Sequence, residues 1–145
     1  MNQILLLALM FCGGIAIAVQ PSINGRLAQK IGTFESSCIS FAVGTLLLSI
    51  VVLVAGKGSL KGVANASWWE LTGGGLGAFF VTMTIVAIPR IGTTAAMAAV
   101  IGAQLATGCI LDHFGLFGFR TIPLDGKRTI GVVLLMAGAS LIIRK

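Results

Sequence analysis

Amide side chains in the first apolar stretch are the groups best suited to chemistry in this sequence. Gln20 and Asn24 stand four residues apart and would share one face of a helix. Pro21 lies on the turn between them, and because proline has no N–H it cannot donate to the carbonyl of Ile17. Amides both donate and accept hydrogen bonds. The pattern therefore predicts that Gln20 and Asn24 bind a polar substrate beside a helix kink at Pro21.

A third amide, Gln104, interrupts the small-residue stretch "TTAAMAAVIGAQLATG" near its middle. Two interpretations are open. Gln104 could bond to a neighbouring helix, or it could line a solute path opposite Gln20 and Asn24. The small residues in this stretch would let helices approach closely, as would Gly73 and Gly77 in "GGGLG", which lacks the Lys-Ser/Thr ending of a phosphate loop.

Charged side chains near the predicted helix ends are candidates for coupling or gating. Arg26 falls about 33 Å beyond Ile4 along a helix, which favours an anchor at the membrane interface. Glu35 opens the second apolar stretch, where helix capping is the competing role. Asp112 closes the fourth, the unfavourable end for a negative charge, so we expect a cationic partner or a function. Glu70 is expected to cap the start of the third.

The sequence contains no hydrolytic, redox or metal-binding pattern. His113 is its single histidine, and the cysteines, Cys12, Cys38 and Cys109, lie in apolar surroundings without metal-ligand spacing. We therefore expect no enzyme activity, no cofactor, no metal and reduced cysteines. Lys and Arg occur singly at the ends of apolar runs, which indicates a membrane interface and no nucleic-acid partner.

The composition indicates the elements that must position these residues. The chain has 145 residues, of which 57% are apolar and 10% charged, and its mean hydropathy is +1.04. That composition predicts an all-α protein that passes the lipid bilayer several times. Apolar stretches predict five transmembrane helices in a single domain, 1–145, with the first retained and not cleaved as a signal peptide. They span residues 3–29, 34–55, 70–88, 92–111 and 128–143.

The connections between these helices are short except for "DHFGLFGFRTIPLDGKR", the longest predicted loop. Pro89 is expected to end the third helix, and "PRIG" is so short that the third and fourth helices should be antiparallel neighbours. Trp68 and Trp69 stand where an interfacial aromatic belt would lie. From Ile4 to Val19 the first stretch is only about 24 Å long, less than the roughly 30 Å of hydrocarbon, so we expect its helix to continue through Pro21.

Positive charge does not select one orientation of the chain. Five spans place five Lys and Arg on each side of the membrane. The N-terminal side holds Lys57, Lys61, Arg120, Lys127 and Arg128; the other holds Arg26, Lys30, Arg90, Arg144 and Lys145. Orientation normally follows an excess of positive charge in the cytoplasm. Either some of these residues have no effect and one orientation prevails, or copies insert both ways and pair antiparallel.

The ordered set of apolar and polar segments resembles the small five-helix, YdcZ-like branch of the bacterial drug/metabolite transporter superfamily. The segments that carry the resemblance are "QPSINGRLAQKIG" at 20–32, "SFAVGTLLL" at 40–48, "WWELTGGGLGAFFV" at 68–81, "PRIG" at 89–92 and "GAQLATGCILDHFGLFG" at 102–118. The resemblance implies a bacterial inner-membrane protein that forms half of a ten-helix inverted-repeat transporter, with a second copy or a similar five-helix protein. Related four-helix multidrug transporters carry an acid in their first helix, and this chain has none there.

The function we expect is export or exchange of a small solute by an antiparallel dimer with alternating access. Gln20, Asn24 and Gln104 would bind the solute, and Pro21 would let the second half of the first helix move. Two other functions fit the same sequence. One is a small ion channel with dual topology, and the other is a packing or regulatory subunit that transports nothing itself.

Overall fold

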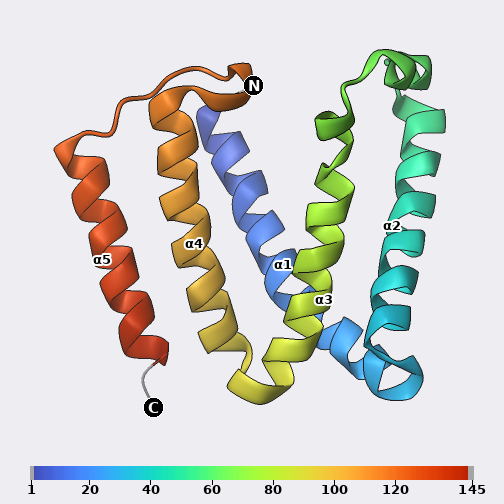
Figure 1. The fold of residues 1–145 in the computed structure, drawn as a ribbon, viewed down its shortest axis with the longest axis horizontal. Helices are drawn as coiled ribbons and strands as arrows, with labels where there is room; N and C mark the ends of the chain where they lie inside the picture. Colours follow the sequence, from blue (N-terminus) through green and yellow to red (C-terminus); the bar gives the residue numbers. More distant parts are fainter. Residues whose placement is uncertain (1, 144–145) are drawn as a thin grey trace. The chain divides into compact units, whose positions relative to one another are not determined.

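Five long helices and three short 3-10 turns make up the computed structural model, which describes residues 2–143. In chain order they are α1 Gln3–Ile31, α2 Thr33–Ala55, η1 Leu60–Asn65, η2 Trp68–Leu71, α3 Gly73–Ile91, α4 Thr93–Phe114, η3 Leu116–Gly118 and α5 Gly126–Ile143 (Figure 1). All five α-helices, α3 together with η2, are long and apolar enough to cross a membrane. The predicted all-α, five-helix membrane class is confirmed.

Helix α1 continues through its proline, as the length of the apolar stretch predicted. Its 29 residues correspond to about 44 Å, longer than the hydrocarbon core. Figure 1 shows the ribbon of α1 changing direction in its second half, the part that follows Pro21. Pro21 itself is buried, whereas its neighbours Gln20 and Ser22 are exposed.

Three expectations about helix ends were wrong. Pro89 does not end α3, which continues to Ile91, because a proline near the end of a helix removes one backbone bond without blocking the last turn. Asp112 lies within α4, which continues to Phe114. Glu70 belongs to η2 and not to α3; its carboxylate accepts the N–H of Ser67 at 2.6 Å, so the expected capping role is confirmed at the 3-10 turn.

The chain divides into two compact units, the first up to Arg90 and the second from Ile91 on. In the first unit α1 packs on α2, and the ring of Phe41 lies against Gly77 of α3, 3.2 Å from the position of an added Cβ. Gly77 therefore permits a close approach, but Gly73 has open space around it, so the expected Gly73–Gly77 face reduces to Gly77. That the whole chain acts as a single domain stays a prediction.

The second unit is built on the pairing of α4 with α5. Gly102 makes this pairing close, because an added Cβ would lie 2.7 Å from the sulfur of Met136. Asp125 caps the start of α5 by accepting the N–H of Arg128 at 2.7 Å.

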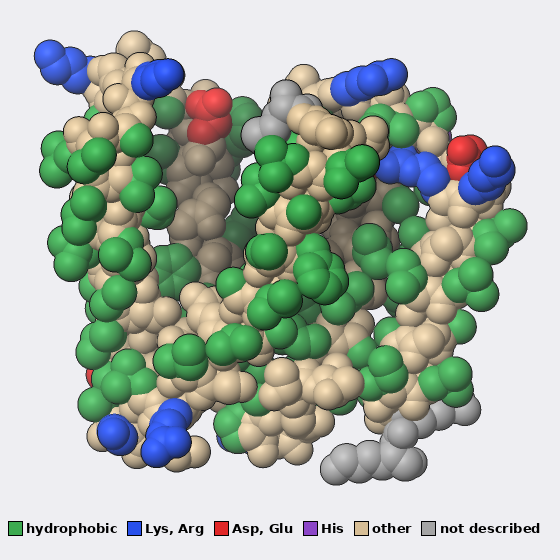
Figure 2. Space-filling model, turned by 180° about the vertical axis from the view of Figure 1, so that it is seen from behind, with side chains coloured by type: hydrophobic (Ala, Val, Ile, Leu, Met, Phe, Trp, Pro, Cys, Tyr) green, Lys and Arg blue, Asp and Glu red, His purple; other side chains and the backbone are tan. Residues whose placement is uncertain are grey.

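In Figure 2, hydrophobic side chains cover the flanks of the helices, and the visible Lys and Arg side chains lie at helix ends. This distribution suits helices that are surrounded by lipid.

Candidate functional site

Asn24 joins α1 to α2 through both its side chain and its backbone. Its amide nitrogen donates to Oγ of Ser40 at 3.2 Å, and its backbone carbonyl accepts from Oγ of Ser36 at 2.8 Å. Asn24 is 6% exposed and Ser36 is fully buried. A buried amide inside a membrane needs such partners, so part of the hydrogen-bonding capacity of Asn24 is used within the fold.

Gln20, one turn earlier on α1, remains exposed. It borders a hollow of about 200 Å³ between α1 and α2, which it shares with Ser40, Thr45 and three apolar or glycine residues. Ser40 therefore links the two amides: it accepts from Asn24 and faces the hollow beside Gln20. We call the residues Gln20, Asn24, Ser36 and Ser40 the α1–α2 polar seam.

Hydroxyl groups extend this polar contact from α2 to α3. Oγ1 of Thr82 donates to Oγ of Ser37 at 3.0 Å, and Ser37 in turn donates to the carbonyl of Thr33 at 3.0 Å. The predictions made from the sequence did not include these hydroxyls. The spacing of Ser36 and Ser40, four residues apart on one helix face, was the signal that could have found part of the seam.

A groove runs between the C-terminal halves of α1 and α3. Its larger part has a volume of about 570 Å³ and is lined by Pro21, Ser22, Gly25, Arg26, Gln29, Lys30, Ile88 and Pro89. A second part of about 350 Å³ shares Gly25, Gln29 and Pro89 and adds Ala28, Thr33, Ile85, Val86 and Arg90. We call the two parts together the α1–α3 groove. Each of the two helices contributes a proline to it.

The predicted charged residues of the first unit have different surroundings. Arg26 lines the α1–α3 groove. Glu35 lies in the first turn of α2, where its carboxylate covers Gly32. No side chain makes a capping hydrogen bond at this end of α2, so the position of Glu35 supports only an interaction with the helix dipole.

In the second unit, Asp112 has the cationic partner that its position predicted. Nη2 of Arg128 lies 2.7 Å from Oδ2 of Asp112 and joins the end of α4 to the start of α5. The backbone carbonyl of Asp112 also accepts the N–H of Ile122 at 2.8 Å.

Gln104 is exposed on α4, and its placement opposite Gln20 and Asn24 stays a prediction.

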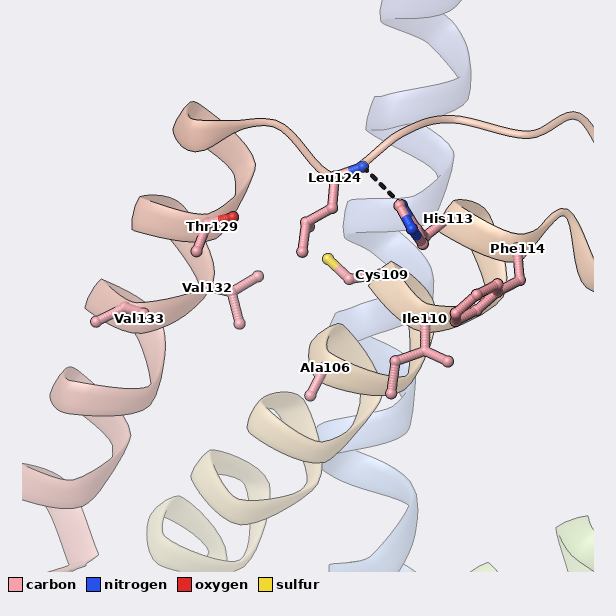
Figure 3. A pocket seen from close by; sticks show the side chains of 9 residues that line it. All are labelled: Ala106, Cys109, Ile110, His113, Phe114, Leu124, Thr129, Val132 and Val133. Atoms are coloured by element: carbon pink, nitrogen blue, oxygen red, sulfur yellow. Dashed lines mark hydrogen bonds between the residues drawn. The ribbon is translucent and has the colours of Figure 1, made fainter.

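An apolar pocket of about 350 Å³ lies between α4 and α5, under the loop that connects them. In Figure 3 its lining side chains include Cys109 and Leu124, and the loop is tied down where the N–H of Leu124 donates to Nδ1 of His113 at 3.2 Å. Within residues 2–143, no three His, Cys, Asp or Glu side chains form a group that could hold a metal ion. The lining of the pocket suits apolar contacts.

Comparison with known proteins connects this arrangement to a family. Residues 5–141 match the family described as "Putative inner membrane exporter, YdcZ". The chain belongs to this family. The Inner membrane protein YdcZ of Escherichia coli (strain K12) is 32% identical over 150 residues, an alignment that covers 100% of this chain and 99% of the relative. No solved structure matches the chain.

Membership of the YdcZ family confirms the resemblance inferred from the sequence. The chain is a multi-pass protein of the bacterial inner membrane, consistent with its five apolar helices. The family is described as one of exporters. Exporters are transporters, a class of protein different from enzymes.

Proposed function

We propose that the chain exports or exchanges a small polar solute as an antiparallel dimer, by alternating access. The observation that carries this proposal is the second half of α1. There Pro21 separates an exposed amide, Gln20, from a buried one, Asn24, and borders a groove of about 570 Å³. A proline break lets two halves of a helix move relative to each other, and broken helices form many transporter sites.

In this mechanism Gln20 contacts the solute, and Asn24 ties the second half of α1 to α2, so that this half and α2 move together about Pro21. Gln104 of α4 completes the set of solute-binding amides. Arg26, Glu35 and Asp112 are the groups available for coupling or gating. Two copies of opposite orientation supply the inverted repeat that alternating access requires.

A test begins with the stability of the purified chain in the presence of amines, sugars, amino acids and halides. A bound solute raises the free energy of unfolding by about 2.7 kcal/mol at a concentration of 100 times its Kd. We expect Gln20→Leu to lose this gain and to abolish flux of the same solute into reconstituted vesicles. Gln3→Leu, the same change at the start of α1, should retain both. Unaltered flux in Gln20→Leu would contradict the proposed path.

One observation favours a second candidate, a packing or regulatory subunit without transport of its own. The amide of Asn24 is bonded across the α1–α2 interface, which is what a purely structural amide would do. This candidate predicts that no solute in the screen stabilises the chain and that the chain becomes stable only with a partner protein. Solute-dependent stabilisation of the purified chain, lost in Gln20→Leu, would exclude it.

A further inference from the structure

Three positively charged side chains line the α1–α3 groove. Arg26 and Lys30 of α1 line its larger part, and Arg90 of α3 lines the smaller part. Gln29 lines both parts, so an amide side chain borders the same groove. Donors from two helices thus border one concave surface.

These cations have no carboxylate partner in the part of the chain that the structure describes. Arg128, in the second unit, is the cation with an ion pair there. The acids of the first unit are Glu35 and Glu70. Glu35 lies against Gly32 and Glu70 against Ser67, and neither reaches within 4.0 Å of Arg26, Lys30 or Arg90. The groove therefore carries three formal positive charges without a paired anion.

The side chain of Arg90 makes one hydrogen bond and keeps further donors for a ligand. Its Nη1 donates to the carbonyl of Val86 at 2.6 Å, which folds the side chain back along α3. A guanidinium has five N–H donors in a fixed planar fork, so the others stay available, and this fork matches the oxygen atoms of a phosphate.

The groove is also long enough to hold a ligand larger than an inorganic ion. From Lys30 at its outer end to Pro21 at its inner end, α1 rises about 14 Å. The three cations lie toward the ends of α1 and α3, at the level expected for the membrane interface. The inner part is bordered by Pro21, Ser22 and Ile88, which leaves less polar space for the organic part of a ligand.

We propose that the α1–α3 groove binds a phosphate-bearing ligand, with Arg26, Lys30 and Arg90 around the phosphate. Three cations exceed what a single carboxylate would neutralise. A phosphate monoester presents three non-bridging oxygens with up to two negative charges, and the phosphodiester of a lipid headgroup presents two with one negative charge. The headgroup of an anionic phospholipid and a soluble phosphorylated solute therefore share an anionic phosphate group that the three cations could bind. This binding site is a proposal separate from transport, because phosphate binding can be measured on a chain that transports nothing.

The test uses the full chain purified in a non-ionic detergent, with inorganic phosphate as the probe and chloride keeping the ionic strength constant. Phosphate should raise the unfolding temperature of the unmodified chain. Arg26→Gln, Lys30→Gln and Arg90→Gln should each weaken the apparent affinity about tenfold, the effect of losing one charged hydrogen bond. Lys57→Gln and Lys61→Gln remove the same charge outside the groove and should leave the affinity unchanged.

A second measurement distinguishes the two sources of phosphate. The chain is released from nanodiscs of phosphatidylglycerol and phosphatidylcholine, and the phosphatidylglycerol that stays bound is counted by native mass spectrometry. Retention that falls in the groove variants identifies a lipid headgroup; a phosphate effect with equal lipid retention identifies a soluble ligand. The proposal is overturned if groove variants and control variants, all eluting as the unmodified chain does, behave alike in both measurements.

Discussion

Gln20 and Asn24 have the same side-chain chemistry and share one face of α1, yet their surroundings differ. Asn24 is buried and donates to Ser40, whereas Gln20 is exposed beside a hollow. A bound amide inside a bilayer contributes to helix association, and a free one is available to a ligand. The sequence predicted solute binding for both residues; we propose packing for Asn24 and solute contact for Gln20.

We expect Asn24→Leu to lower the stability of the chain by about 0.6–2 kcal/mol, the range for a polar contact between membrane helices. The change removes the bond to Ser40 and leaves that hydroxyl without its amide donor. Denaturant unfolding in detergent measures the effect, and Asn65→Leu in the exposed turn η1 is the control. A double-mutant cycle with Ser40→Ala should give less than additive losses; additive losses would show that the bond contributes nothing.

The amides could be predicted from the sequence, but most of their partners could not. Gln20 and Asn24 stand out because polar side chains are rare in an apolar stretch. Ser36 and Ser40 are ordinary residues of a membrane helix, and their importance depends on the register of α2 against α1, which the sequence does not contain. Asp112 was easier, because a negative charge in the last turns of a helix predicts a cationic partner or a function, and the structure supplies the partner in Arg128, in the first turn of α5.

At the scale of elements, the same tetrapeptide pattern joins two helix pairs. Lys30-Ile31-Gly32-Thr33 ends α1 and begins α2, and Arg90-Ile91-Gly92-Thr93 ends α3 and begins α4. The glycines have nearly equal backbone angles, φ 105° and ψ 157° for Gly32 and φ 82° and ψ 156° for Gly92. This region is essentially restricted to glycine. A single residue therefore makes each of these turns.

We expect Gly92→Ala to destabilise the chain by about 1–3 kcal/mol, the cost of a non-glycine residue in this backbone region. No atom lies within 4 Å of a Cβ added at Gly92, so the loss would report backbone strain and not a clash. The unfolding temperature in detergent measures it. Gly74→Ala, in an open position within α3, should be neutral or stabilising. Equal effects of both changes would show that the turn conformation is not required.

Hydropathy predicted the helices well, and local sequence predicted their ends less well. Apolar length is a physical requirement of the bilayer, so five spans could be counted directly. Pro89 misled because proline usually ends helices in water, whereas α3 gains one more turn in which Arg90 donates to the carbonyl of Val86. The α1–α3 groove was not predictable, because it depends on how two helices that are not neighbours in the chain are placed beside each other.

At the scale of the whole molecule, the balance of charge and the groove bear on the same question. Arg26, Lys30 and Arg90 belong to the side of the membrane opposite the N-terminus, and they are part of the five-to-five balance of Lys and Arg. Two copies inserted in opposite orientations would present one α1–α3 groove to each side. A transporter that alternates between the two sides needs related sites on both, so dual topology would give both the charge balance and the groove a function.

We expect a reporter fused to the C-terminus to give signals from both sides of the inner membrane. Removing two positive charges from the N-terminal side, with Lys57→Gln and Lys61→Gln, should leave the excess on the other side and fix the C-terminus in the cytoplasm. The matched pair Lys30→Gln and Arg90→Gln should fix it outside. Orientation responds to so few charges only when the two insertions are nearly equal in free energy. A one-sided signal from the unmodified chain would therefore remove the antiparallel homodimer, and a similar five-helix protein of opposite orientation would have to supply the second half.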